Sequence, residues 1–365
     1  MTRRFTLLSM PLLVVACGGP RSQPAPAPAP APATEEPRRA GSAGEPLGRP
    51  AREIRLPPVE RIPGSDSVAM EGLPPLIGPE VLPPADDDRA AARARRERPP
   101  VPVLPGAIIP RQRIIAFYGT PVSTRMGILG ELPPDEMLAR LDREVGAWRA
   151  ADPATPARPA LHVIAVMAAG DPGPDSLYRI RLPERHIERV MEWAARRDAL
   201  VFLDIQTGLS DIRAELPRLG RWLIRPNVHL GLDPEWNMPG DARPGTRIGT
   251  MSADEVNHAI DYLADLVSEH GLPPKVLVVH RFTSSMLRNA SDIRIDPRVQ
   301  VVINMDGWGP PAQKIQAYRD IVAPEADQYT GFKLFYRNDL KGGSRLLTPA
   351  EILQLDPAPI YIQYQ

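Results

Sequence analysis

The sequence is poor in cysteine and carries no net charge. Cys17 is the only cysteine, so the chain can form no internal disulfide, and cysteine catalysis in a folded domain is excluded. The 44 Lys and Arg residues are balanced by 44 Asp and Glu residues. Without a basic surplus the chain has no electrostatic footprint for DNA or RNA, and we expect no nucleic-acid partner.

Motifs of several enzyme classes are also missing. There is no Gly-x-Ser-x-Gly elbow, which disfavours acyl transfer, and no Gly-rich dinucleotide or phosphate-binding loop. The six histidines are scattered, without a His-x-His or a His-Glu-x-x-His pattern, so we predict neither a metal nor another cofactor. A metal-dependent hydrolase using Asp204, Asp233 and His280 stays an alternative.

The first residues have the pattern of an export signal. Two arginines precede an apolar stretch at 5–16, which is too short to span a membrane and is followed by Cys17. The run Val14-Val15-Ala16-Cys17 resembles the bacterial lipobox. By that resemblance residues 1–16 are a signal peptide, and a lipid on Cys17 holds the protein in the cell envelope, at the outer membrane or the cell surface. An ordinary secretory signal with an unrelated cysteine is the alternative.

Residues 17–105 lack the periodicity of helices or strands. The run at 24–32 alternates proline and alanine, which favours an extended polyproline conformation, and the rest mixes Pro, Gly and charge. We predict a disordered Pro/Ala-rich tether that separates a folded domain at 106–365 from the membrane. Within 60–110, apolar residues are scattered among the prolines, and we expect part of this segment to pack against the folded domain.

The folded part alternates predicted strands and helices. Strand character is found at 113–118, 161–168, 199–206, within 226–238, and at 275–280, 299–306, 331–336 and 360–364. Helical patterns occupy 134–150, 184–197, 211–223 and 252–271, the last with a capping box at Ser252 and a stop at Gly271. Eight such units in roughly 260 residues predict an α/β fold, a (β/α)8 TIM-like barrel.

The stretch 226–238 is the most informative of these segments. Its apolar and polar side chains alternate, which is typical of a barrel strand with one face on the helices and one toward the axis. Asp233 and Glu235 share the polar face at the C-terminal end, where barrel active sites lie. Two residues along a strand span roughly 6.6 Å, so we expect both carboxylates in one site, each perturbing the pKa of the other.

Further candidate site residues follow Asp233 and Glu235 or lie at the C-terminal ends of the other predicted strands. The further candidates are Tyr118, Asp204, Gln206, Trp236, His280, Asn304, Asp306, Trp308, Tyr336, Gln363 and Tyr364. Rings stack on sugar faces, amides and carboxylates bind hydroxyls, and a carboxyl pair can cleave a glycosidic bond, so the set indicates a glycan or cell-wall polymer as partner. His162 is expected at the opposite end of its strand, in a packing role.

Asp233-Pro234-Glu235 resembles the Asp-x-Glu motif of two families of barrel enzymes, glycoside hydrolase families 18 and 25. Met305-Asp306-Gly307-Trp308 is similar to the sixth-strand Met-x-Tyr-Asp of family 18. The resemblance implies that Glu235 is the general acid and that Asp233 orients an N-acetyl group or stabilises positive charge. Asp306 or Asp204 is then the second carboxylate.

A non-catalytic barrel that binds glycan or a protein partner is the alternative to a hydrolase. It would use the rings of Tyr118, Trp236, Trp308 and Tyr364 as a stacking platform and would not need an acid of raised pKa. In either case we expect a monomer.

Overall fold

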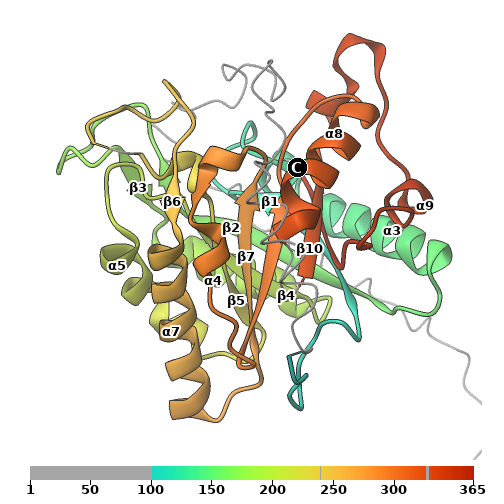
Figure 1. Ribbon diagram of the computed structural model, residues 1–365, viewed down its shortest axis with the longest axis horizontal. Coiled ribbons are helices and arrows are strands. Elements are labelled where there is room, and N and C mark those ends of the chain that lie inside the picture. Colours follow the sequence, from blue (N-terminus) through green and yellow to red (C-terminus); the bar gives the residue numbers. More distant parts are fainter. Residues whose placement is uncertain (1–100, 239, 326–328) are drawn as a thin grey trace, which may run out of the picture. The chain divides into compact units, whose positions relative to one another are not determined.

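The computed structural model describes residues 101–238, 240–325 and 329–365. The predicted signal peptide at 1–16, Cys17 and nearly all of the predicted tether at 17–105 lie outside these residues, and they stay predictions. In the described part, strands occupy the middle and helices surround them (Figure 1).

Eight parallel strands close into a barrel. They are β1 (Arg113–Gly119), β2 (Ala157–Ala168), β4 (Leu200–Ile205), β5 (Val228–Leu232), β7 (Lys275–Arg281), β9 (Val299–Met305), β10 (Tyr329–Leu334) and β11 (Tyr361–Tyr364). Each strand pairs with the next in this order, and β11 pairs back onto β1. The predicted (β/α)8 TIM-like barrel is therefore confirmed.

Two strands differ from the prediction by more than one residue at a boundary. β2 begins at Ala157 and runs through Pro159, whereas the sequence suggested a start at 161 because proline donates no hydrogen bond to a ladder. β10 begins at Tyr329 and ends at Leu334, two residues before the predicted end at Tyr336. The earlier start of β2 places His162 in the middle of its strand, and the earlier end of β10 leaves Tyr336 beyond its strand.

Helices fill the connections between strands. The long ones are α3 (Pro134–Ala151), α4 (Glu184–Ala195) and α7 (Ala253–His270), and α7 has the predicted capping box of Ser252 with Glu255. The helix predicted at 211–223 is split into α5 (Ile212–Glu215), η2 (Leu216–Leu219) and α6 (Gly220–Leu223), since Pro217 cannot donate within a continuous helix. No helix within the described ranges is both long enough and apolar enough to cross a membrane.

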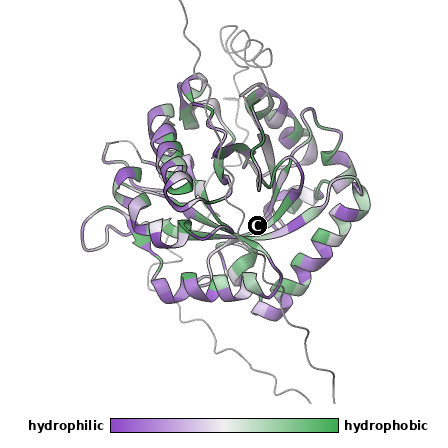
Figure 2. Ribbon diagram, turned by 90° about the horizontal axis from the view of Figure 1, so that it is seen from below, coloured by the Kyte–Doolittle hydropathy of each residue, from purple (hydrophilic) through white to green (hydrophobic). Residues whose placement is uncertain are grey.

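Shorter elements complete the chain. They are α2 (Ile128–Glu131), β3 (Arg179–Arg181), η3 (Pro234–Trp236), β6 (Met251–Ser252), η4 (Ser284–Met286), β8 (Leu287–Arg288), η5 (Ala290–Asp292), α8 (Pro311–Ala317), η6 (Tyr318–Val322), η7 (Ala323–Glu325), η8 (Asn338–Gly343) and α9 (Pro349–Ile352). β3 pairs antiparallel with the C-terminal end of β2, and β6 pairs with β8. The view from below shows helices arranged around the strands (Figure 2).

The barrel interior has an apolar half and a polar half. Near the N-terminal ends of the strands, one buried cluster joins Ile114, Ala116, Leu200, Phe202, Val276, Val278 and Val302. Ile109 packs into this cluster from the preceding segment, and its backbone N–H and C=O both bond to the side chain of Gln300. Residues 107–109 thus pack on the barrel, whereas the apolar residues within 60–100 lie outside the described residues, and their packing stays a prediction. Polar side chains fill the half of the barrel interior near the C-terminal ends of the strands.

Candidate functional site

Three carboxylates meet at the C-terminal end of the barrel. Asp233 follows β5 directly, and the 3-10 turn η3 brings Glu235 back toward it. Asp306 follows β9. One carboxylate oxygen from each of these residues lies within 4.8 Å of the other two, and all three side chains are buried. The structure thus brings Asp233 and Glu235 together, as expected from their positions along the strand.

Glu235 is buried without a stabilising partner. Its side chain is 5% exposed, and among the described residues no hydrogen bond or cation contact reaches its carboxyl group. Burial raises the pKa of Glu235 well above its ordinary value, and the nearby charges of Asp233 and Asp306 raise it further. The opposing charges of Lys333 and His280 are outweighed, and the surroundings of Glu235 favour its neutral acid form over the carboxylate.

The backbone around Glu235, unlike its side chain, is held by a hydrogen bond and by close packing. Gly249 donates its N–H to the carbonyl oxygen of Glu235 at 2.6 Å. A Cβ atom at Gly249 would lie 2.5 Å from that oxygen and 2.6 Å from the carbonyl oxygens of Pro234 and Asn237, so only glycine allows this approach. The close approach of Gly249 therefore fixes the turn that carries Glu235.

The carboxyl group of Asp233 has one hydrogen-bonded oxygen and one without a partner. Gln206 donates its amide to Asp233 Oδ2 at 3.1 Å, while Oδ1 has no hydrogen-bond partner. Burial raises the pKa of Asp233 to about 7, with the negative charges of Asp204 and Asp306 adding to the effect against the opposing charge of His280. Asp233 can therefore gain or lose a proton near neutral pH.

Asp306 is the ionised member of the group. Lys333 Nζ lies 2.7 Å from Oδ1, and His280 Nδ1 lies 3.0 Å from Oδ2. Burial alone would favour the neutral acid, but the charges of Lys333 and His280 outweigh it and lower the pKa of Asp306. Lys333 also stands 3.9 Å from the centre of the Tyr118 ring, which fixes its position.

A second cluster lies beside the three carboxylates, around Asp204. His162 Nε2 is 3.3 Å and His280 Nε2 is 3.6 Å from Asp204 Oδ1, and Tyr118 donates its hydroxyl to Oδ2 at 2.9 Å. Burial opposes ionisation of Asp204, yet the two histidines lower its pKa. His280 joins both clusters, and burial, which would lower its pKa, is outweighed by Asp306 and Asp204, which raise it to about 10.

His162 differs from His280 in its protonation. Burial lowers the pKa of His162 to about 4, although Asp204 acts in the opposite direction. Its Nδ1 atom is 2.6 Å from the hydroxyl of Tyr361 and 3.0 Å from the amide nitrogen of Gln363. The ring is therefore neutral and held in one orientation. His162, Asp204 and His280 could hold a metal ion, as could Asp233, Glu235 and Asp306.

Most of the residues predicted for the site do come together. The barrel interior contains Tyr118, Asp204, Gln206, Asp233, Glu235, His280, Asn304, Asp306 and Gln363. Asn304 Nδ2 lies 3.4 Å from His280 Nδ1, and Gln206 Nε2 also donates to the Tyr118 hydroxyl at 3.2 Å. All of these side chains except Glu235, whose carboxyl makes no hydrogen bond to a described residue, are joined in one network by hydrogen bonds or ion pairs.

Four predicted aromatic residues are not part of this network. Tyr364 accepts a hydrogen bond from Trp148 of α3 at 2.9 Å, and Tyr336 donates to Glu144 of α3 at 2.7 Å, so both lie outside the barrel. The two rings stack with centroids 5.3 Å apart. Trp236 is only 2% exposed, and Trp308 lies under the ammonium of Lys341, 4.7 Å from the ring centre.

The sequence reasoning missed three interior residues, His162, Lys333 and Tyr361. His162 was assigned to the wrong end of its strand because β2 begins four residues earlier than predicted. Lys333 and Tyr361 alternate with the outward Leu334 and Ile362, so the period of two along β10 and β11 was the available signal. A lysine between Phe332 and Leu334 in an apolar strand has no reason to be there except a buried partner.

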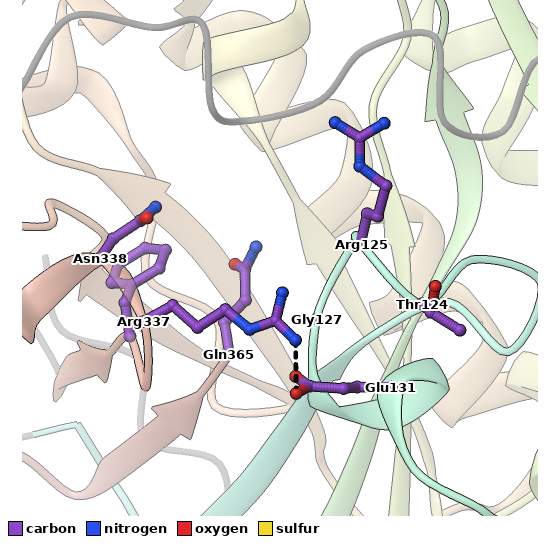
Figure 3. Close-up of a pocket in the computed structure, with 8 residues that line it drawn as sticks. Thr124, Arg125, Gly127, Glu131, Arg337, Asn338 and Gln365 are labelled. Atoms are coloured by element: carbon purple, nitrogen blue, oxygen red, sulfur yellow. Dashed lines mark hydrogen bonds and ion pairs between the residues drawn. The ribbon is translucent and has the colours of Figure 1, made fainter.

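A hollow opens on the rim near this network. It is bordered by Thr124, Arg125, Gly127, Glu131, Phe335, Arg337, Asn338 and Gln365, and its empty space of about 460 Å³ includes open solvent (Figure 3). Arg337 reaches across to Glu131 at 2.7 Å. The ring of Phe335, which borders the hollow, lies 4.9 Å from Lys333 Nζ. The hollow is thus one side chain away from the Lys333–Asp306 pair.

Comparisons with known proteins add a structural likeness. No protein-family model and no curated protein matches the chain. The structure is similar to Cel5A of Thermotoga maritima, solved in complex with cellobiose, with a TM-score of 0.40 and 8% identity over 72% of this chain and 92% of that chain. It is also similar to dihydropteroate synthase of Burkholderia cenocepacia, with a TM-score of 0.30 and 13% identity over 69% and 85%. Because both TM-scores are low, the barrel assignment rests on the strand pairing of this chain.

Proposed function

We propose that the barrel hydrolyses glycosidic bonds, with Glu235 as the general acid. The observation that carries this proposal is the close group of Asp233, Glu235 and Asp306, in which one carboxyl has no partner and another is held by two cations. Neighbouring carboxyl groups whose environments push their pKa values apart are the arrangement that acid catalysis of glycoside cleavage needs.

The roles follow from the contacts of each residue. Glu235 gives its proton to the leaving oxygen, since its carboxyl is neutral and makes no competing hydrogen bond. Asp306 is the second carboxylate, because Asp204 is engaged by Tyr118 and lies between two histidines. Asp233, fixed by Gln206, faces the same space and orients the substrate or stabilises positive charge.

The short separation favours retention of configuration. Inverting glycosidases hold their carboxyl groups roughly 6.5–9.5 Å apart to admit a water, and retaining ones roughly 5–5.5 Å. Here the nearest oxygens are within 4.8 Å. Asp306 would then bond to the anomeric carbon as Glu235 protonates the departing oxygen. Water, deprotonated by Glu235, would cleave the resulting ester and release Asp306.

The enclosure of the site indicates which part of a glycan it takes. Asp233, Glu235 and Asp306 are each 5% exposed or less, which fits a terminal sugar or a short glycoside better than an internal position of a long polymer. We propose an envelope or extracellular glycan as the source, with the lipid anchor at Cys17 and the predicted tether at 17–105 keeping the barrel near it.

The test compares the full chain with Glu235→Gln on peptidoglycan, chitin-type and neutral glycans and on short aryl glycosides. Release of reducing ends by the wild type that disappears in the variant is the expected result. Glu144→Gln, which changes a carboxyl on α3 outside the barrel, is the matched control and should keep full activity. Equal release by wild type and Glu235→Gln would refute the assignment of the acid.

The binding alternative loses its main support. It required the rings of Tyr118, Trp236, Trp308 and Tyr364 as a platform, but three of these are buried, with exposures of 1%, 2% and 3% for Tyr118, Trp236 and Tyr364. Stacking on a sugar needs an accessible ring face. Binding without release, equal in wild type and Glu235→Gln, is the outcome that would favour this alternative.

A further inference from the structure

The cluster around Asp204 contains three polar atoms that the proposed hydrolysis does not use. His162 Nε2, His280 Nε2 and Asp204 Oδ1 have no hydrogen-bond partner, although all three side chains are 0% exposed. Buried polar atoms are normally paired, and an unpaired set needs an explanation. These three atoms lie within 4.8 Å of one another.

The distances are long for hydrogen bonds. The separation of 3.6 Å between His280 Nε2 and Asp204 Oδ1 is beyond hydrogen-bond range, and the 3.3 Å to His162 Nε2 is long. A longer separation is expected for two ligand atoms that bind the same metal ion. Bonds of about 2.1 Å at a tetrahedral angle place neighbouring ligand atoms about 3.4 Å apart. Both measured separations are near this value.

The other polar atom of each ligand is already held by a neighbour. His162 Nδ1 is 2.6 Å from the Tyr361 hydroxyl, and His280 Nδ1 is 3.0 Å from Asp306. Asp204 Oδ2 accepts from Tyr118 at 2.9 Å. Metal-binding histidines typically have their second nitrogen fixed by a carboxylate or another polar group, which orients the ring and selects the tautomer.

The backbone of β5 keeps the space between the ligands clear. A Cβ atom at Gly231 would lie 2.4 Å from both Asp204 Oδ1 and His162 Nε2. Any side chain at this position would therefore occupy the region on which the three atoms converge. Glycine at 231 is explained by that requirement, since Gly231 has no positive φ angle to account for it.

We propose that His162, Asp204 and His280 bind one divalent transition-metal ion of the zinc type. Two imidazoles and one carboxylate suit Zn²⁺, Co²⁺ or Fe²⁺, whereas Mg²⁺ and Ca²⁺ favour oxygen ligands alone. The ligands come from β2, β4 and β7, so the ion cross-links three strands of the barrel. The metal site shares His280 with the proposed catalytic group, since His280 Nδ1 contacts Asp306. Its test is nevertheless separate from glycoside hydrolysis, because metal binding is measured without any substrate.

The test measures metal binding without any substrate. The full chain, treated with a chelator and dialysed, is titrated with Zn²⁺ and with Co²⁺, followed by the visible absorption of Co²⁺, by metal analysis after gel filtration and by melting temperature. We expect one ion per chain and a raised melting temperature. His162→Gln should bind at least about 100-fold more weakly, while His258→Gln, a half-buried histidine on α7, should bind as the wild type does.

A second variant protects the test against misfolding of His162→Gln. Tyr361→Phe keeps the ring and removes the hydroxyl that orients His162, and it should weaken binding by about 10–100-fold. A wild-type chain that takes up neither ion and shows no shift in melting temperature would overturn the proposal. So would binding of equal strength in wild type, His162→Gln and Tyr361→Phe, since the ion would then lie elsewhere.

Discussion

Two buried glutamates, Glu215 and Glu235, have opposite surroundings. Glu215 of α5 accepts from Arg179 at 2.8 Å, from Arg181 at 2.7 Å and from Ser210 at 2.5 Å. Burial opposes its ionisation, but these donors outweigh burial and lower its pKa to about 2. Glu235 has no donor and two negative neighbours, and its pKa is raised. Both side chains are 5% exposed or less, but burial, which is the largest cause of the raised pKa of Glu235, is outweighed at Glu215 by its three donors.

The difference separates a structural carboxylate from a chemical one. Glu215 is charged and ties β3 to α5 through two arginines, which fixes the rim of the barrel. Glu235 lies close to two other carboxyl groups and its pKa is raised, an arrangement that favours the protonated acid. Changing each glutamate in turn tests whether the two residues have these different roles.

The largest effect is expected from Glu235→Gln on catalysis. On the glycoside that the wild type cleaves, kcat should fall by about 10²- to 10⁴-fold, because general acid catalysis contributes this much. The free energy of unfolding at pH 7 should be unchanged or higher, since glutamine removes a carboxyl whose ionisation is penalised by burial. Kinetics and denaturant unfolding of the same preparation measure both. A large loss of stability would contradict the account.

Glu215→Gln should show the reverse behaviour. Glutamine at 215 removes the carboxylate shared by Arg179 and Arg181 and leaves Arg179 with Asp175 alone, so the free energy of unfolding should fall by about 2–3 kcal/mol. The folded-state pKa of Glu215 is depressed below the ordinary 4.5, so its contribution is present above pH 4.5 and is lost as the pH falls toward 2. Wild type and variant should therefore converge in stability toward pH 2. A constant difference across that range would contradict the assignment.

Gly231→Ala tests the crowding of the barrel centre. The added methyl group would lie 2.4 Å from Asp204 and His162, and overpacking of this kind should lower the free energy of unfolding by about 1–3 kcal/mol. Gly146 on α3 is the matched control, because a Cβ atom there meets nothing within 4 Å. Gly146→Ala should stabilise the protein by roughly 0.5–1 kcal/mol through helix propensity. Thermal or urea unfolding distinguishes the two.

The smallest effect is expected at the outward tyrosine. Tyr364→Phe loses the hydrogen bond from Trp148 and should lower the free energy of unfolding by about 1 kcal/mol without changing catalysis. Tyr118→Phe, which loses the bond to Asp204 inside the barrel, should lower kcat/KM. Equal catalytic loss in both variants would show that the inside and outside of the barrel had been wrongly assigned.

Strand positions and the Asp233–Glu235 pair could be predicted from the sequence because they follow local rules. Alternation along 226–238 separated the two faces, and the C-terminal position of the carboxylates followed from barrel geometry. The cations beside Asp306 could not be found this way, because His280 and Lys333 come from strands whose neighbours in space are set by barrel closure.

The failures among the aromatic residues have a simple physical cause. Tyr336 and Tyr364 were selected because they end predicted strands, but the period of two places Lys333 and Gln363 inward and Leu334 and Tyr364 outward. An aromatic ring at a strand end can pack on a helix as well as line a site, and here α3 offers Trp148 and Glu144 as partners. Tyr364 does end its strand but lies on the outer face, whereas Tyr336 lies two residues beyond the end of β10.

The protonation state of Glu235 is the most direct test of the central claim. Infrared difference spectra between wild type and Glu235→Gln, and between wild type and Glu215→Gln, can be recorded at pH 7 without any substrate. We predict that the first difference contains the C=O stretch of a neutral carboxylic acid and that the second contains only carboxylate bands. An ionised Glu235 at pH 7 would contradict its assignment as the general acid.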